Sequence, residues 1–307
     1  MSKTIGLIGC GKWGRNILRD LISLKCRVIV TDPLLQARET ALRMGAELAA
    51  ENALEMKNDA CDGYVIASPI LTLAREAERI LRFGKPVFCE KPVFTTDEEK
   101  ERLLAAGASE RLFAMYKFCY HPGIEALHSI IASREIGQVE MIMLQRLNWD
   151  DDFQGTDSLW LAGVHQISIV QRLLGYIPEP RSAAVSFHDG IITNASITLG
   201  DACPVIITMS SRHPVKNMSV TVSGSGGAAL LPDAYAESIV IKNKGRDREY
   251  RRIGKEMPLL LELKDFTDYL QGGCRPRCGF DMAERISSTI FKIRCIANAP
   301  CANPFPS

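Results

Sequence analysis

The 307-residue sequence has no long apolar segment and no cluster of charges of one sign, and each absence argues against a class of protein. Its formal net charge is +1, with no basic cluster and no acidic tail, which argues against a nucleic-acid partner or a membrane surface. No apolar run approaches the roughly 18 residues that a membrane-spanning helix needs. The N-terminus leads at once into an apolar strand, so we expect no signal peptide. Internal repeats and low-complexity segments are also absent, so we expect an ordinary globular protein.

Cysteine, by contrast, is frequent, with ten residues in the chain. Because several lie in expected buried strands, we predict free thiols and a cytoplasmic location. A metal site is the alternative for Cys274 and Cys278, with Cys295 and Cys301 further along. We expect no metal, because the spacing is not a C-x2-C pair, a proline interrupts it and no histidine is near. The thiols expected in buried strands are those of Cys26, Cys61, Cys89 and Cys119.

The first strand runs directly into Gly9-x-Gly11-x-x-Gly14, followed by a helical pattern and a second strand over residues 26–31 that ends on Asp32. That order of strand, glycine turn, helix, strand and acid predicts a dinucleotide-binding site. Gly9 permits the tight turn, Gly11 lets the main chain approach a pyrophosphate, and Gly14 lets the helix pack close to the strand. The pyrophosphate would lie on the N–H groups of the helix N-terminus. The alternative, a glycine-rich turn without a ligand, leaves the position of Asp32 as a coincidence.

Asp32 also bears on which dinucleotide binds. A carboxylate at the end of the second strand accepts hydrogen bonds from the ribose hydroxyls and repels a 2′-phosphate, so we predict NAD, with NADP as the alternative. Arg38, in the next helix, could reach a 2′-phosphate, but we expect it to be a solvated helix charge. Trp13 is expected to pack over the cofactor or, alternatively, to be part of the apolar helix face. The residues predicted to bind the cofactor here are Gly9, Gly11, Lys12, Trp13, Gly14 and Asp32.

The succession of strands and helices predicts an α/β chain of two domains. Strands and helices alternate over residues 1–119, which is typical of a Rossmann domain with a doubly wound parallel sheet. Residues 120–307 contain several strands separated by short turns, which predicts an α+β domain with a large open, mainly antiparallel sheet. Two helices, at residues 259–270 and 282–297, end this domain, and the last one could pack back on the first domain.

Several motifs share their order and position with one known family. The motifs of the first domain are the glycine turn, Ala67-Ser68-Pro69 after the fourth strand and Glu90-Lys91-Pro92 at the end of the fifth. Those of the second domain are Tyr120-His121-Pro122, Ile136-Gly137-Gln138-Val139, Gly163-x-His165 and the Pro258-to-Phe266 helix. With these motifs the chain resembles the glucose–fructose oxidoreductase / inositol dehydrogenase (Gfo/Idh/MocA) family over nearly its whole length.

The resemblance implies a reaction and a role for Lys91. Family members mostly oxidise or reduce a secondary alcohol or ketone of a sugar, cyclitol or sugar nucleotide, so a small, sugar-like substrate is implied. Hydride transfer from a carbinol needs a group that takes the hydroxyl proton, and an ammonium stabilises the developing alkoxide. Lys91 is therefore the expected catalytic residue, with a solvated strand-end charge as the alternative, and its bond to Pro92 is expected to be cis. The further cofactor-binding residues implied are Ala67, Ser68, Pro69, Glu90 and Lys91.

His165 resembles the family's catalytic histidine of the second domain. The family has one aspartate four residues before it and another three residues after it, and these positions are Leu161 and Ser168 here. Either another acid substitutes, or Lys91 and His165 act without them. Alternatively, His165 is a structural residue bonded to a main-chain carbonyl. The acids just upstream of this segment are Asp150, Asp151, Asp152 and Asp157.

The remaining expectations concern the substrate, the assembly and competing functions. Tyr120, His121, Arg146 and Asn148 are candidate substrate-binding residues, each with a structural role as the alternative. A homodimer or homotetramer is implied, because family members pair through the exposed face of the second domain's sheet. One competing function is the reduction of a non-sugar carbonyl or imine, and another is a non-catalytic NAD-binding regulator. The retention of Lys91 argues against the regulator.

Overall fold

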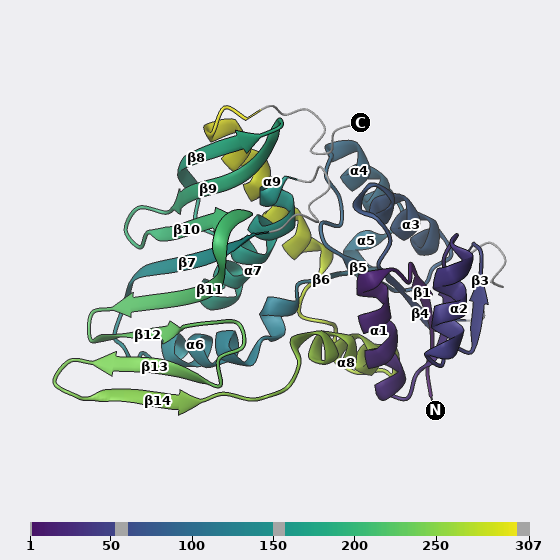
Figure 1. The fold of residues 1–307 in the computed structure, drawn as a ribbon, viewed down its shortest axis with the longest axis horizontal. Coiled ribbons are helices and arrows are strands. Elements are labelled where there is room, and N and C mark those ends of the chain that lie inside the picture. Colours follow the sequence, from purple (N-terminus) through teal and green to yellow (C-terminus); the bar gives the residue numbers. More distant parts are fainter. Residues whose placement is uncertain (1, 53–60, 150–156, 300–307) are drawn as a thin grey trace. The chain divides into compact units, whose positions relative to one another are not determined.

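A computed structural model describes residues 2–52, 61–149 and 157–299. The chain forms two compact units, one of residues 1–117 with 257–284 and the other of residues 118–256 with 285–307 (Figure 1). Each unit is built on its own sheet. The predicted fold class is confirmed, since a parallel sheet is followed by a large, mainly antiparallel one.

The first unit contains a six-stranded parallel sheet in the order β3-β2-β1-β4-β5-β6. Strands β1 and β4 are neighbours at the point where the strand order reverses, and ligands of such sheets bind at the carboxyl ends of the strands there. The sixth strand ends at Met115, and the 3₁₀ turn η2 (Lys117–Tyr120) follows it. The strands are β1 (Thr4–Ile8), β2 (Arg27–Thr31), β3 (Leu48–Ala50), β4 (Gly63–Ile66), β5 (Val87–Glu90) and β6 (Leu112–Met115). The helices before residue 117 are α1 (Lys12–Ser23), α2 (Leu35–Arg43), α3 (Ile70–Arg82), α4 (Asp97–Ala105) and α5 (Ala108–Arg111).

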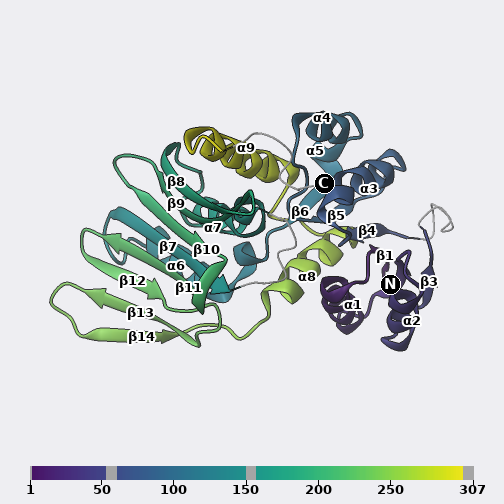
Figure 2. The same ribbon diagram turned by 45° about the horizontal axis from the view of Figure 1, so that its top comes forward.

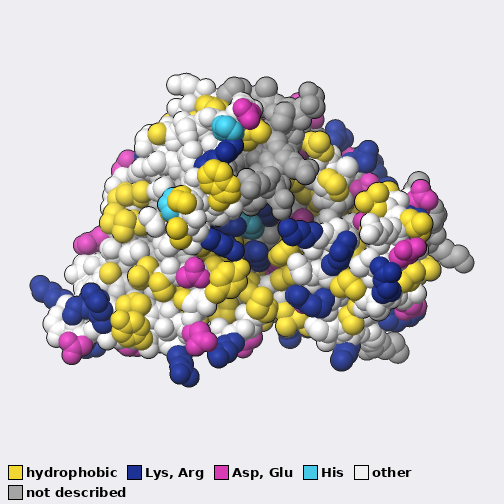
Figure 3. Space-filling view, viewed as in Figure 1, with side chains coloured by type: hydrophobic (Ala, Val, Ile, Leu, Met, Phe, Trp, Pro, Cys, Tyr) yellow, Lys and Arg dark blue, Asp and Glu magenta, His cyan; other side chains and the backbone are white. Residues whose placement is uncertain are grey.

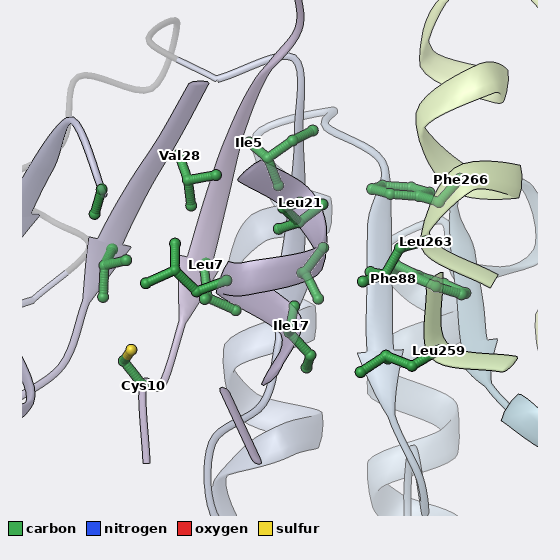
Figure 4. Packing of buried hydrophobic residues seen from close by; sticks show 14 of the residues in the cluster. Ile5, Leu7, Cys10, Ile17, Leu21, Val28, Phe88, Leu259, Leu263 and Phe266 are labelled. Carbon is green, nitrogen blue, oxygen red and sulfur yellow. The ribbon is translucent and has the colours of Figure 1, made fainter. Parts of the chain in front are cut away.

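Helix α8 (Pro258–Leu270) belongs to the first unit, although the sequence-based boundary at residue 119 assigns it to the second domain. Leu263 and Phe266 are fully buried in a cluster that includes Ile17 and Phe88 (Figure 4). The rings of Phe88 and Phe266 stack with their centroids 5.1 Å apart. Because the residues that α8 contacts lie in the first third of the chain, the local pattern around it could not assign it to this core.

The second unit contains an eight-stranded sheet in the order β14-β13-β12-β11-β7-β10-β9-β8, in which β7 and β10 are parallel and all other pairs are antiparallel. Helices α6 and α7 pack against each other beside this sheet (Figure 2). The strands are β7 (Val139–Trp149), β8 (Pro180–His188), β9 (Ile191–Leu199), β10 (Val205–Ser210), β11 (Arg212–Gly224), β12 (Gly227–Leu231), β13 (Ser238–Asn243) and β14 (Arg248–Arg252). The helical segments are α6 (Pro122–Ala132), the π-helical turn η3 (Leu159–Gly163), α7 (Val164–Leu174) and α9 (Phe280–Ile296), whose first residues belong to the first unit.

The cysteines of the described residues form no disulfide. Of the four expected in buried strands, only Cys89 lies in one: Cys61 and Cys119 are buried outside strands, and Cys26 is half-buried just before β2. Within the three described ranges, no three His, Cys, Asp or Glu side chains gather in a way that could hold a metal ion. None of the helices in the described part of the chain combines the length and apolar character needed to cross a membrane.

Candidate functional site

The glycine turn joins β1 to α1 and shapes the N-terminus of that helix. Gly9 has φ +89°, and a Cβ there would lie 2.6 Å from the carbonyl oxygen of Ala67. A Cβ on Gly14 would lie 2.3 Å from the carbonyl oxygen of Gly9, so the helix can pack this closely only with glycine. A Cβ on Gly11 would meet nothing within 4 Å. Gly9 and Gly14 are therefore required by the fold, whereas Gly11 leaves open space beside the first N–H groups of α1, as a pyrophosphate site requires.

Asp32 follows β2 and holds the glycine turn. Its Oδ2 accepts a hydrogen bond from the Cys10 N–H at 2.8 Å, and its Oδ1 accepts one from the Leu34 N–H at 2.9 Å. A carboxylate has about four acceptor positions, so the same two oxygens retain capacity for ribose hydroxyls. Arg38 differs from the expected solvated charge: its Nη1 donates to the carbonyl oxygens of Asp32 and Pro33, both at 2.9 Å.

The turn after β4 lies directly beside the glycine turn. The N–H of Ala67 donates to the carbonyl oxygen of Ile8 at 2.8 Å, which continues the β1–β4 pairing to the end of both strands. The Thr72 hydroxyl lies 2.9 Å from the Ser68 hydroxyl and 2.7 Å from the carbonyl oxygen of Pro69. Ala67, Ser68 and Pro69 are thus at the carboxyl edge of the sheet, next to the segment predicted to bind the cofactor.

Strand β5 ends at Glu90, and the Lys91–Pro92 bond that follows is cis, as expected. The Trp13 indole N–H donates a hydrogen bond to Glu90 Oε1, and the Lys91 main-chain N–H donates one to Glu90 Oε2 at 3.2 Å. Burial raises the pKa of the Glu90 carboxyl, while the nearby Lys91 charge, the Trp13 hydrogen bond and the Lys117 charge act in the opposite direction. The structure therefore brings together three predicted residues of the first unit, Trp13, Glu90 and Lys91.

Lys117 completes this cluster and was not among the candidate residues. Its Nζ lies 4.7 Å from the centre of the Trp13 ring, a cation–π contact. Lys117 follows β6, the strand beside β5. Its position after the carboxyl end of a parallel strand, where ligands of such sheets bind, could have marked it as a candidate in the sequence.

In the second unit, His165 and Arg146 both contact the ring of Phe118. The His165 ring packs edge-on to Phe118 with centroids 5.2 Å apart, and the Arg146 guanidinium lies 5.6 Å from the centre of the Phe118 ring. His165 is the second residue of α7, directly after the π-helical turn η3, and is only 6% exposed. Arg146 and Asn148 follow the buried Ile142 and Leu144 at alternate positions of β7, so they lie on the same face of the sheet.

His121 has a structural position. Its Nδ1 accepts a hydrogen bond from the Gly123 N–H at 3.0 Å and so caps α6, while its Nε2 lies 2.8 Å from the carbonyl oxygen of Ala234. Because Nε2 must then be the donor, both ring nitrogens are engaged within the chain. Tyr120, the last residue of η2, is 4% exposed.

Leu161 and Ser168 stand at the two positions where the family has aspartates, so neither position supplies a carboxylate. The Ser168 hydroxyl donates to the main-chain carbonyl oxygen of His165 at 2.7 Å. Asp157 is engaged elsewhere, because its Oδ1 accepts from the Leu159 N–H at 2.8 Å and its Oδ2 pairs with the buried Arg294 guanidinium. Burial nevertheless raises the pKa of Asp157. The other candidate acids, Asp150, Asp151 and Asp152, lie outside the described residues.

Comparison with known proteins agrees with this arrangement. Residues 3–118 match the family described as "Oxidoreductase family, NAD-binding Rossmann fold". The chain is 26% identical over 301 residues to an inositol 2-dehydrogenase of Burkholderia vietnamiensis, covering 89% of this chain and 87% of the relative. It is 29% identical over 267 residues to an inositol 2-dehydrogenase of Rhizobium meliloti, covering 78% and 79%. A solved oxidoreductase from Agrobacterium radiobacter, in complex with NAD+, L-tartaric acid and magnesium, has a TM-score of 0.87 at 15% identity and covers 97% of both chains.

The matched segment includes the glycine turn and the Glu90-Lys91-Pro92 motif. Its residues fit an NAD cofactor, because Gly11 leaves space at the N-terminus of α1 and the Asp32 carboxylate keeps acceptor capacity beside it. Residues 3–118 therefore match the NAD-binding Rossmann fold of the Gfo/Idh/MocA oxidoreductase family, and the chain is similar to inositol 2-dehydrogenases over most of its length.

Proposed function

We propose that this oxidoreductase transfers a hydride between NAD and a secondary alcohol or ketone of a polyhydroxylated substrate, namely a sugar, a cyclitol or a sugar nucleotide. The observation that carries the proposal is the placement of Lys91 at the carboxyl end of β5, where Glu90 joins it to the first turn of α1. The inositol 2-dehydrogenase relatives support a polyol of this kind.

The proposal gives a chemical role to side chains in each unit. The nicotinamide, when bound, accepts or supplies the hydride. Lys91 hydrogen-bonds the reacting oxygen: as a neutral amine it takes the hydroxyl proton when the alcohol is oxidised, and as the resulting ammonium it returns that proton to the ketone oxygen in reduction. His165 is the second proton-handling group of the proposal, and its ring packs edge-on against Phe118, which restricts its orientation. Arg146, Asn148 and Tyr120 are the proposed contacts to substrate hydroxyls or to an anionic group, whereas we assign His121 to capping α6.

The proposal is tested by the formation of NADH, measured by absorbance, with NAD+ and a panel of myo-inositol, hexoses and sugar nucleotides. Lys91→Met keeps the length of the side chain and removes its charge, so it should abolish turnover without releasing bound NAD. Turnover of a polyol that disappears in this variant supports the proposal. NAD binding without turnover of any alcohol, ketone or imine would favour the regulator instead.

A second candidate, the reduction of a non-sugar carbonyl or imine, is favoured by one observation. Leu161 cannot exchange a proton, and the Ser168 hydroxyl bonds the main chain, so His165 lacks the carboxylates with which the family's histidine works. NADH oxidation with simple keto acids and cyclic imines, in the absence of activity on the carbohydrate panel, would favour this reductase.

We further propose a homodimer or homotetramer that forms through the sheet of the second unit. Met143 alternates with the buried Ile142 and Leu144 along β7 and is 38% exposed, so it lies on the outward face. Figure 3 shows several hydrophobic side chains exposed, among polar ones, on the surface of this unit. Exposed apolar surface on a sheet face is typical of an interface between copies. The absence of disulfides among the described cysteines supports a reducing compartment, and we propose the cytoplasm.

A further inference from the structure

The Trp13 side chain joins two parts of the first unit that are far apart in the sequence. Trp13 is the second residue of α1, and Glu90 is the last residue of β5. One oxygen of the Glu90 carboxylate accepts the indole N–H of Trp13, and the other accepts the main-chain N–H of Lys91 at 3.2 Å. A single carboxylate therefore connects the helix whose N-terminus suits the pyrophosphate with the main chain of Lys91.

Packing alone does not explain a tryptophan at this position. The Trp13 side chain is 36% exposed, so its ring adds little to the buried core. Its two polar contacts are specific, however: the N–H faces Glu90, and the ring face lies against the Lys117 ammonium at 4.7 Å. A phenylalanine would keep the ring face for Lys117 and lose only the donor to Glu90.

We infer that Trp13 is a positioning residue: its indole N–H holds the Glu90 carboxylate and thereby sets the main chain of Lys91 when the dinucleotide occupies the glycine turn. The consequence for turnover rests on the proposed function of Lys91, whereas the link between Trp13 and Lys91 does not. Helix α1 carries Trp13 and also offers its N-terminus to the pyrophosphate. The link therefore couples cofactor binding to the geometry of Lys91, the proposed catalytic residue.

The charges around Glu90 give the link a pH dependence. Burial raises the pKa of Glu90, and Lys91, the Trp13 hydrogen bond and Lys117 act against that rise. Cys89, the preceding residue, is a buried thiol whose own pKa is raised well above its usual value, so it stays neutral. Removal of the Trp13 donor therefore raises the pKa of Glu90 further, and the carboxylate becomes protonated at a higher pH than in the wild type.

The test compares Trp13→Phe with Tyr250→Phe, which removes a polar group from another exposed aromatic residue, outside the proposed site. We expect amide hydrogen exchange at Lys91 to become about tenfold faster in Trp13→Phe, because a locally opened hydrogen bond exchanges more readily. NAD should slow this exchange in the wild type and not in the variant. We expect kcat to fall by about 10- to 100-fold, with the KM of the alcohol little changed and the acidic limb of the kcat profile moved to higher pH. Tyr250→Phe should match the wild type in every measurement.

A double-mutant cycle shows whether Trp13 acts through Glu90. In a Glu90→Ala background, Trp13→Phe should have little further effect on kcat or on exchange at Lys91. Glu90→Gln, which keeps the size of the side chain, should remove the acidic limb. Additive losses in the cycle, or unchanged exchange at Lys91 in Trp13→Phe, would overturn the inference. If exchange at Lys91 changes in Trp13→Phe but the wild type turns over no substrate, the proposed function and the expected loss of kcat are overturned. The link from Trp13 through Glu90 to Lys91 would still stand.

Discussion

Substitution of Asp32 by alanine should weaken the glycine turn and the preference for NAD together. Two main-chain donors lose their acceptor, the N–H of Cys10 at 2.8 Å and that of Leu34 at 2.9 Å. Leu34 is 68% exposed, so water can replace the carboxylate there, whereas Cys10 is fully buried. A buried donor left without a partner costs about 1–3 kcal/mol, and we expect a loss of this size in the free energy of unfolding.

The effect on the cofactor is of similar size. Hydrogen bonds from ribose hydroxyls to a charged acceptor contribute about 1.5–3 kcal/mol, so NAD should bind roughly 10- to 100-fold more weakly to Asp32→Ala. A 2′-phosphate would no longer meet a negative charge, so NADP should lose less affinity or gain some. Asp32→Asn keeps an acceptor for the Cys10 N–H, and its change in affinity therefore reports on the charge with the turn preserved.

Calorimetric titrations of NAD and NADP and thermal unfolding of the same samples measure both effects. Asp201→Ala is the matched control, because Asp201 is exposed and pairs with the exposed Arg181 in a contact of little expected value. Wild-type NAD affinity in Asp32→Ala, or tighter binding of NADP than of NAD by the wild type, would refute the role given to the carboxylate. An unchanged unfolding midpoint would refute its role in holding the turn.

Three further predictions concern catalysis, the glycine turn and assembly. Lys91→Ala should lower kcat by about 10²–10⁴ with little change in NAD affinity, and His165→Ala should cost less; steady-state kinetics check both, and the reverse order of damage would contradict the assigned roles. Gly11→Ala should fold normally and bind NAD weakly, whereas Gly14→Ala should lower the unfolding midpoint, because its Cβ would lie 2.3 Å from a carbonyl oxygen. Thermal unfolding followed by circular dichroism and titration with NAD compare the two variants, and equal stability of the two would count against this account. Light scattering at micromolar concentration should show an oligomer that Met143→Arg dissociates, and a monomeric wild type would disprove the proposed interface.

The local motifs were predictable because each depends on neighbours in the sequence or on adjacent strands. Gly9, Gly14 and Asp32 lie close together because β1, α1 and β2 follow one another in the chain, and the order of strand, helix and strand predicts this. The cis Lys91–Pro92 bond came from the family resemblance and was confirmed. Whether Lys91 and His165 act as proposed stays a prediction.

Other features were not predicted, because the sequence pattern alone does not reveal the contacts that these side chains make. Lys117 gains its place only because β6 pairs with β5 and brings it to the ring of Trp13. His121 looks like a polar candidate in the sequence, but both its nitrogens are engaged by Gly123 and Ala234. Arg38 looks like a solvated charge, but main-chain carbonyls at the end of β2 hold it.

The membership of α8 in the first unit has a consequence for the order in which the chain can fold. The ribosome releases β1 to β6 early, but Phe88 remains without the ring of Phe266 until residues 257–270 have emerged. The nascent nucleotide-binding half must therefore wait, with apolar surface uncovered, while the whole second sheet is synthesised, and such exposure favours aggregation and chaperone binding. A fragment that ends at residue 119 would keep that surface permanently, whereas fusion of residues 257–284 to it would restore the missing part of its core.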